Sequence, residues 1–416
     1  MELVFSPEFQ RLRYVRLCNI NSLYLTGASE PKRFEHCLGV YHLADQWTKS
    51  RRLTQRQADV VRAAAILHDI QTGPFGHTFQ YVMEDNPFEQ RFEHASLDSG
   101  VRNRFLQLVE AGAHFSGQKF AVYGLLGELA SDVFAAIEGK GEFGPIISGS
   151  IDLDNLDNVV RLAFHMGLCS DADRTLPIEV TPLIQPFADG LAAENSALPL
   201  FERWFHIRRR LYEFLLLDRG EFAAKAMLTL AVEQAADAQI LGPDDWRLTD
   251  DGLLDALHDR SVGENQIISQ IIKRLRVGNL FECIGIWQTP MVNEYKRLSE
   301  SLNKRDLETI IDEKISSSFS ARFRTCLHYI LDKKKTCRSI SVRNINTGNE
   351  EKVGYDSETL LVGAFVTNWR ATPLSSGERQ KTREIVINTL EANGLRMLAI
   401  APEPLANPIG NPGLFE

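Results

Sequence analysis

The stretch that most constrains the fold runs from residue 60 to residue 70, where an apolar segment ends directly in His68-Asp69. Apart from Arg62, residues 60–67 are apolar, which predicts a helix buried on several of its faces. Imidazole and carboxylate groups are costly to bury unless they are paired or coordinated. Two explanations follow: a divalent metal ion held by His68 and Asp69, or a capped helix end with a hydrogen-bonded histidine.

Two other segments favour the metal explanation. Upstream, residues 33–36 (Arg-Phe-Glu-His) open an apolar helix, so His36 lies in its first turn. Downstream, residues 151–161 place several acids, including Asp154, on a helix that also has an apolar face. Two imidazoles and two carboxylates from separate helices suit a hard or borderline divalent ion with open coordination positions.

The order H…HD…D resembles that of the HD-domain phosphohydrolases. Within them it is similar to the branch of the deoxynucleoside triphosphate triphosphohydrolases and the SAM-and-HD-domain protein. The resemblance covers roughly residues 1–290, and its strength lies in the order and number of the motifs. These are Phe9-Gln10-Arg11-Leu12-Arg13, Gly27-Ala28-Ser29, Arg33-Phe34-Glu35-His36, Leu67-His68-Asp69, Gly73-Pro74-Phe75 with His77, Asp152-Leu153-Asp154, Leu211-Tyr212-Glu213, residues 223–228 and Leu248-Thr249-Asp250-Asp251.

The resemblance implies a role for each matching residue. One divalent metal ion would be held by four side chains, His36, His68, Asp69 and Asp154. Arg33 lies one helical turn before His36, so its guanidinium could grip a phosphate at the same site. His77 and His94 match the histidines that supply protons, and Tyr212 matches a tyrosine that contacts the nucleotide. Taken alone, each of the two histidines would more often be a hydrogen-bonded structural residue, and Tyr212 could equally be part of the core packing.

The chain departs from the branch at the proton relay. The second catalytic histidine of the branch is replaced by Thr72, which cannot shuttle a proton near neutral pH. Two further relay positions hold Gln80 and Ala95. Substrate-contacting positions differ as well; they are Leu17, Asn155, Leu162 and Arg208. We expect Asn155 and Arg208 to contact a substrate whose identity has changed with these residues.

Three functional hypotheses remain open. The first is a metal-dependent phosphohydrolase that converts deoxynucleoside triphosphates to nucleoside and triphosphate. The second is a hydrolase of another nucleotide or phosphate ester, and the third is a catalytically weakened HD protein that senses nucleotides or binds a partner. The resemblance also implies homo-oligomers and an activating nucleotide. Manganese, iron, magnesium, nickel and zinc all suit the predicted ligands.

Composition narrows the class of protein. The 416-residue chain is long enough for two or three packed units, and its net charge of −9 does not indicate a nucleic-acid-binding surface. Six cysteines lack any CxxC spacing, so neither a disulfide framework nor a zinc finger is expected. No apolar run reaches the length of a membrane span, and the first residues do not resemble a signal peptide. We expect a cytoplasmic protein.

The pattern of helical and strand-like segments in the sequence predicts a mainly α protein. Residues 1–290 should form an all-α HD-domain core with a helical extension, and residues 291–334 a helical connector. Within the core, residues 177–195 predict a β excursion. From residue 335 strand-like and helical segments alternate, which indicates a small α+β unit over 335–416 with a proline-rich tail.

Overall fold

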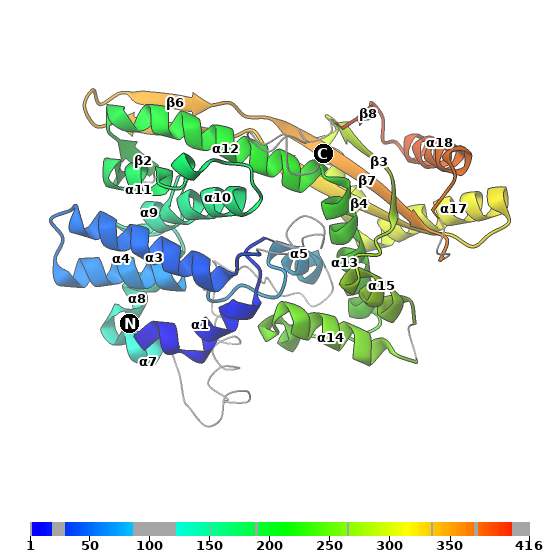
Figure 1. The fold of residues 1–416 in the computed structure, drawn as a ribbon, viewed down its shortest axis with the longest axis horizontal. Helices are drawn as coiled ribbons and strands as arrows, with labels where there is room; N and C mark the ends of the chain where they lie inside the picture. The colour runs from blue at the N-terminus through cyan, green and yellow to red at the C-terminus, as the bar shows by residue number, and fades with distance from the viewer. Residues whose placement is uncertain are drawn as a thin grey trace.

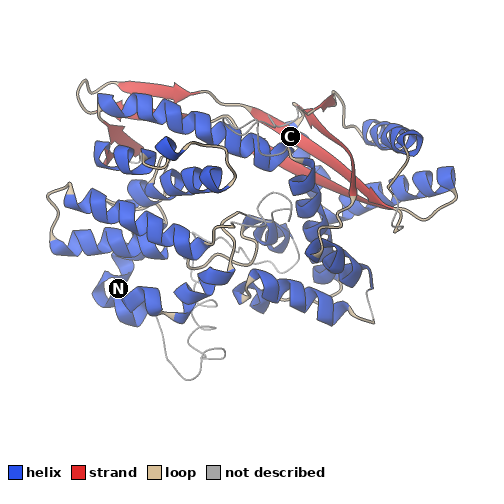
Figure 2. Ribbon diagram, in the orientation of Figure 1, coloured by secondary structure: helices blue, strands red, loops and turns tan. Residues whose placement is uncertain are grey.

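The computed structural model describes residues 2–18, 30–85, 122–149, 151–187, 190–263, 266–333, 336–369 and 373–401. Helices make up most of this part of the chain, and the strands gather mainly towards the C-terminus (Figures 1 and 2). The predicted fold class, a helical core with a smaller C-terminal α+β unit, is confirmed. No helix in the described ranges is long and apolar enough to span a membrane.

The helices of the N-terminal half are α1 (Pro7–Arg11), α3 (Arg33–Lys49), α4 (Gln55–Leu67), α5 (His77–Asp85), α7 (Val122–Leu126), α8 (Ala130–Ile137), α9 (Gly144–Ile147), α10 (Leu153–His165) and α11 (Leu176–Val180). Those of the C-terminal half are α12 (Leu198–Leu217), α13 (Arg219–Asp237), α14 (Asp250–Ser261), α15 (Gln266–Arg276), α16 (Tyr295–Ser299), α17 (Ser301–Phe319) and α18 (Ser376–Ala392).

Helix α4 positions the His68-Asp69 pair. Thr54 caps its first turn by accepting a hydrogen bond from the Gln57 N–H, and the Gln57 side chain accepts one from the Thr54 N–H. At its other end, residues 63–67 are all buried, as the sequence predicts. The helix packs against α3, α8 and α9, so it delivers His68 into the interior of the helical core.

The first sheet joins the helical core to a hairpin from the C-terminal region. Its strands are β1 (Ile184–Phe187), β2 (Gly190–Ala193), β5 (Ser339–Asn344) and β6 (Glu350–Gly354), in the order β1-β2-β5-β6. Strands β2 and β5 are parallel, and the other pairs are antiparallel. The hairpin therefore packs on α12 of the core rather than on the second sheet.

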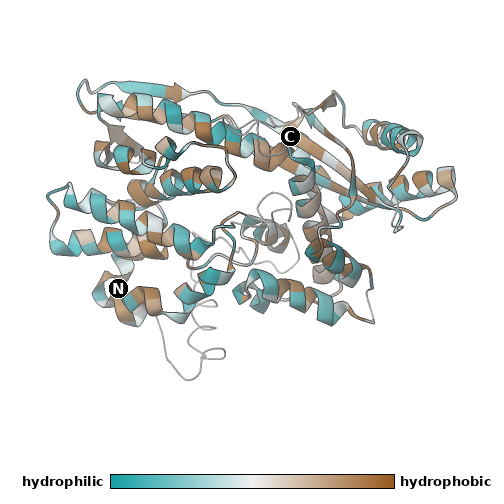
Figure 3. Cartoon of the chain, viewed as in Figure 1, coloured by the Kyte–Doolittle hydropathy of each residue, from teal (hydrophilic) through white to brown (hydrophobic). Residues whose placement is uncertain are grey.

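The second sheet is antiparallel and has the order β4-β7-β3-β8, with β3 (Glu282–Thr289), β4 (Arg324–Lys333), β7 (Glu358–Thr367) and β8 (Ala399–Ile400). Strand β7 is hydrophobic along most of its length (Figure 3) and is buried on both faces. Cys326 and Phe365 belong to the apolar cluster built around α13, whereas Leu327 and Val366 belong to the cluster of α17 and α18. Helices thus cover both faces of this sheet.

Two sequence predictions need correction here. The connector predicted as helical over 291–334 contains α16 and α17 but ends in β4, which pairs with β7 over ten residues. Sheet pairing therefore crosses both predicted domain boundaries, at 290 and at 335. The β excursion predicted over 177–195 begins instead as α11, because Pro177 in the first turn of a helix is favourable; strands start only at Ile184.

Candidate metal centre

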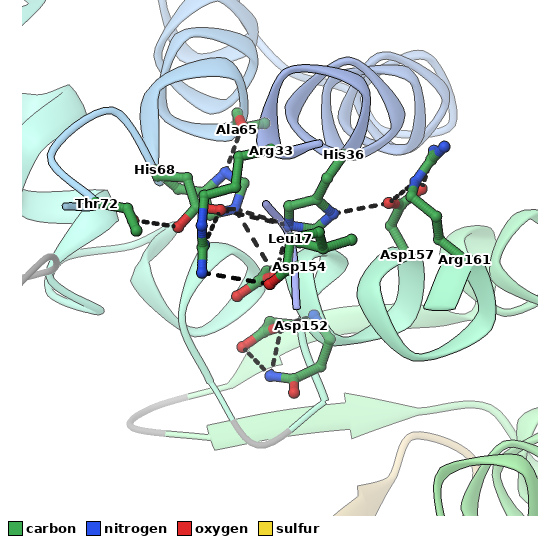
Figure 4. A network of polar contacts seen from close by, with 12 residues as sticks. Leu17, Arg33, His36, Ala65, His68, Thr72, Asp152, Asp154, Asp157 and Arg161 are labelled. Atoms are coloured by element: carbon green, nitrogen blue, oxygen red, sulfur yellow. Dashed lines mark hydrogen bonds and ion pairs between the residues drawn. The ribbon is translucent and has the colours of Figure 1, made fainter. Parts of the chain in front are cut away.

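Three helices bring the predicted metal ligands to one point. His36 lies in the first turn of α3, His68 caps the C-terminus of α4 with Asp69 directly after it, and Asp154 lies in the first turn of α10. Figure 4 shows the side chains of His36, His68 and Asp154 pointing toward one another from their separate helices. His36, His68 and Asp69 are buried, while the side chain of Asp154 keeps 34% of its exposure.

The four donor atoms converge closely. His36 Nε2 lies 3.1 Å from His68 Nε2 and 2.9 Å from Asp154 Oδ1. Asp69 Oδ2 lies 3.9 Å from His36 Nε2 and 3.7 Å from His68 Nε2, and His68 Nε2 lies 3.7 Å from Asp154 Oδ1. His36, His68 and Asp69 by themselves form a group that could hold a metal ion.

Outer contacts orient both imidazoles. His36 Nδ1 lies 2.8 Å from Asp157 Oδ2, and His68 Nδ1 lies 2.8 Å from the carbonyl oxygen of Ala65. An Nδ1–H that donates to such an acceptor leaves the Nε2 lone pair directed at the centre. Asp157 is itself fixed by Arg161, whose Nε and Nη2 donate to it over 2.8 and 2.9 Å. The Nε2 atoms are therefore held ready to coordinate.

Gly39 allows this outer contact to form. It lies on α3, and a methyl group in its place would collide with the side chains of Asp157 and Arg161 on α10. The close approach of α10 to α3 at this point therefore requires a residue without a side chain.

The pKa values show a site that demands positive charge. Burial acts to lower the pKa of His36, but the hydrogen bonds to Asp154 and Asp157 outweigh it and raise that pKa to about 9. Burial acts to raise the pKa of Asp69. Nearby positive charge, chiefly that of Arg33, outweighs burial and lowers this pKa. The pKa of Asp154 is held well below its usual range by its hydrogen bonds to His36 and His68, against the effect of burial. A divalent cation would satisfy the same demand for positive charge.

The donor set fits a metal ion. Two imidazole nitrogens and two carboxylate oxygens come together, and each imidazole has its other nitrogen engaged outside the centre. A set with only four protein donors leaves positions for water and substrate on an octahedral ion. His36, His68, Asp69 and Asp154 are the residues that would hold it.

Arg33 and Thr72 both contact Asp69. Arg33 Nη1 lies 2.5 Å from Asp69 Oδ2, and its Nε has no hydrogen-bond partner among the described residues. The Thr72 hydroxyl donates to Asp69 Oδ1 over 2.9 Å. Thr72 therefore positions the carboxylate, where a histidine would have offered a titrating nitrogen. The buried Arg33 guanidinium therefore retains an N–H that could donate a hydrogen bond to a bound anion.

The other predicted site residues lie in three places. His77 begins α5, and its Nδ1 lies 3.0 Å from Gln80 Oε1. Asn155 donates to Asp152 through its side chain, over 2.9 and 3.1 Å, so its amide is committed to the start of α10. The guanidinium carbon of Arg208 lies 4.5 Å from the centre of the Tyr212 ring on α12. His94 and Ala95 lie outside the described residues.

The sequence interpretation missed several residues that shape the centre. Asp157 and Arg161 follow Asp154 at helical spacings of three and seven residues, a signal that was available in the sequence. Arg11 was noted only as part of a motif. Its Nη2 donates to the carbonyl oxygens of Ile70 and Thr72, over 3.3 and 2.5 Å, and so fixes the turn after Asp69.

Comparisons with known proteins agree with this geometry. Residues 33–162, which contain all four donor residues, match the family model described as HD domain. The chain is 22% identical over 312 residues to the deoxynucleoside triphosphate triphosphohydrolase SAMHD1 homolog of Dictyostelium discoideum, covering 68% of this chain and 56% of that protein. It is 23% identical over 370 residues to the SAMHD1 triphosphohydrolase of Homo sapiens, covering 76% of this chain and 58% of that one.

A solved structure shows the same fold. A phosphohydrolase from Bacteroides thetaiotaomicron matches with a TM-score of 0.60 at 17% identity, covering 87% of this chain and 94% of that chain. The alignments to the two curated triphosphohydrolases span a little over half of the length of those proteins.

Proposed function

From the premise that residues 33–162 of this chain form an HD domain, we propose that the protein is a metal-dependent phosphohydrolase acting on deoxynucleoside triphosphates. The products would be nucleoside and triphosphate. The observation that carries the proposal is the convergence of His36, His68, Asp69 and Asp154, in which an oxygen of each carboxylate lies within 3.9 Å of both imidazole Nε2 atoms. Two triphosphohydrolases among the relatives support the choice of substrate.

The metal ion, when bound, would lower the pKa of a water molecule and polarise a phosphoryl oxygen. Arg33 would bind the phosphates, because its guanidinium is buried beside Asp69 and still has an unpartnered Nε. Tyr212 would contact the nucleoside. Its partly buried ring is stacked on Arg208, and burial raises the pKa of its hydroxyl, so it would act as a neutral hydrogen-bonding group.

His77 would supply the proton to the leaving oxygen. It is partly exposed at the start of α5, and Gln80 would orient its ring through Nδ1. Thr72 supports the centre through Asp69 and supplies no titrating group. His94 is proposed as a second proton carrier from the family resemblance alone.

A second candidate function is nucleotide binding without turnover. The observation that favours it is the pair of replacements at Thr72 and Gln80, each of which puts a side chain that does not titrate near neutral pH beside a site residue. Loss of relay groups lowers proton-transfer rates more than it lowers metal or phosphate affinity. Such a protein would sense nucleotides or bind a partner.

A product assay distinguishes these functions. Purified protein is incubated with manganese or magnesium and with the four deoxynucleoside triphosphates, singly and as a mixture, because one nucleotide could activate hydrolysis of another. Chromatography then measures nucleoside and triphosphate. The matched variants are His36→Ala and His42→Ala, since His42 lies on the same helix but is exposed and contacts Gln46.

Nucleoside plus triphosphate from the wild type and from His42→Ala, but not from His36→Ala, is the expected result. Release of diphosphate or monophosphate instead would show that the attack falls on another phosphorus atom, and would contradict the proposed products. If the protein binds metal and nucleotide but forms no product, the hydrolase proposal is wrong and the second candidate function, nucleotide binding without turnover, takes its place.

A further inference from the structure

A pocket lies outside the HD domain, between α15, α17 and the start of β4. Its volume is about 660 Å³, a size typical of small-molecule sites. Its lining residues come from 266–270, 312–316 and 322–324, together with Trp369. None of them lies within residues 33–162, so the pocket shares no residue with the metal centre.

Aromatic side chains form one part of the wall. Phe323 is 5% exposed and packs against Phe319, while the partly buried Trp369 follows the end of β7. The Arg274 guanidinium carbon lies 5.9 Å from the Trp369 ring centre, and Phe281 meets that ring edge-on at 5.9 Å. These neighbours hold the indole in place, and Trp369 is one of the residues that line the pocket.

The backbone at Trp369 is in an unusual conformation. Its φ is +60°, in the left-handed region that residues with a side chain rarely adopt. The Trp369 N–H donates to Thr367 Oγ1 over 3.1 Å, which helps to stabilise the turn. Such backbone strain is concentrated at ligand-binding positions.

Two arginines give the pocket a cationic side. The Nε of Arg324 is buried and has no hydrogen-bond partner among the described residues. Its Nη1 lies 3.8 Å from Asp312 Oδ2, too far for a hydrogen bond. The other oxygen of Asp312 accepts from the Thr325 N–H over 2.5 Å. Arg322 is exposed at the same wall. A buried N–H without an acceptor is costly, and an anionic ligand would supply the acceptor.

Amide groups complete the opposite side. Gln266 and Gln270 lie one helical turn apart on α15, and both are exposed. Each can donate and accept hydrogen bonds along the edge of a heteroaromatic ring. Aromatic surface, amides and a guanidinium with an unpartnered Nε are therefore arranged around one space, together with the carboxylates of Asp312 and Glu313.

We propose that this pocket binds a small planar heteroaromatic anion of mononucleotide size. The ring would stack on Trp369, and the anionic group would accept from Arg324 and Arg322. The proposal does not depend on the function of the metal centre.

Trp369 provides a local reporter of binding. The chain has five tryptophans, and Trp369 is the most exposed; the other four are at most 3% exposed. These are Trp47, Trp204, Trp246 and Trp287. The full-length protein is titrated with AMP, UMP, adenosine and inorganic phosphate, and the intrinsic fluorescence is followed. Adenosine carries the ring without the anion, and phosphate carries the anion without the ring.

AMP or UMP is expected to give a saturable change that is absent in Trp369→Phe. Arg324→Gln should weaken the affinity about tenfold, the loss expected for one charge-assisted hydrogen bond of about 1.4 kcal/mol. Arg203→Gln, which removes a guanidinium paired with Asp173 elsewhere, and His68→Ala at the metal centre should leave the affinity unchanged. Gln270→Glu, a surface change on α15, should weaken binding by repelling the anion.

Several results would overturn the proposal. One is the absence of a saturable change with both nucleotides, and another is the same change in Trp369→Phe. Equal affinity for the nucleotides in wild type, Arg324→Gln and Gln270→Glu would show that the charge of the pocket takes no part in binding the anionic group. Phosphate alone binding as tightly as AMP would show that the aromatic wall takes no part.

Discussion

Asp157 is predicted to set the metal affinity of the centre without touching the metal. The residue is 8% exposed, and its carboxylate receives one hydrogen bond from His36 Nδ1 and two from Arg161, each of 2.8–2.9 Å. In Asp157→Asn only one oxygen remains to accept these donors, and the new amide N–H₂ faces another donor. His36 therefore loses either its charge-assisted hydrogen bond or its orientation.

The expected loss follows from this geometry. Removing an outer-shell partner of a metal-binding histidine typically lowers metal affinity about 10- to 100-fold. At about 1.4 kcal/mol for each factor of ten, the binding free energy falls by roughly 1.4–2.8 kcal/mol. The loss should arise in metal binding itself, so it does not require a known substrate.

Calorimetric titration of metal-free protein with Mn²⁺ measures this effect. The matched control is Asp59→Asn on α4, where the carboxylate is 42% exposed and accepts a hydrogen bond from Gln55. Circular dichroism shows whether both variants remain folded. Wild-type affinity in a folded Asp157→Asn protein, or an equal loss in the Asp59→Asn control, would refute the argument that Asp157 orients His36.

Three further predictions concern stability, each measured by urea unfolding. Gly39→Ala should destabilise the protein by about 1–3 kcal/mol, because the added methyl group overpacks the contact between α3 and α10; no loss would show that the two helices separate freely. Lys304→Met leaves the buried carboxylate of Glu233 unpaired and should cost about 3–5 kcal/mol, most of which Glu233→Leu in the same chain should restore. Burial, partly offset by Lys304 and by the Leu327 N–H, raises the pKa of Glu308 from 4.5 to about 7. The folded state then binds a proton that the unfolded chain has released, so stability falls as pH rises from about 4.5 to 7, and Glu308→Gln should flatten that slope.

The sequence predicted the parts of the centre that are carried by local spacing. His68 and Asp69 are adjacent, and the apolar run before them indicated a buried helix end, which is where the structure places them. His36 and Asp154 could be joined to them through the resemblance to HD proteins. Spacing within single helices cannot show which side chains meet across helices, so the contact of Asp157 with His36 was not predicted.

The rest depended on pairing between distant segments. The second sheet places β3, β4 and β7 side by side although they are separated by helices α16 and α17 and by the β5-β6 hairpin. That hairpin pairs with β2, about 150 residues earlier, through the register Ala192↔Arg343. Strand propensity identifies such segments but does not select their partners. The boundary at 335 was predicted from the strand-like segments that follow that residue. These strands belong to two different sheets, and both sheets also contain strands from before residue 335.

The most direct test of the metal centre is the metal content of the purified chain. Wild-type protein and His42→Ala are loaded with Mn²⁺, freed of excess ion by gel filtration, and measured by mass spectrometry of the metal. One equivalent per chain is predicted for both, and much less than one for His36→Ala and Asp154→Ala. A full equivalent retained in both of these variants, with their fold intact, would contradict the assignment of His36, His68, Asp69 and Asp154 as its ligands.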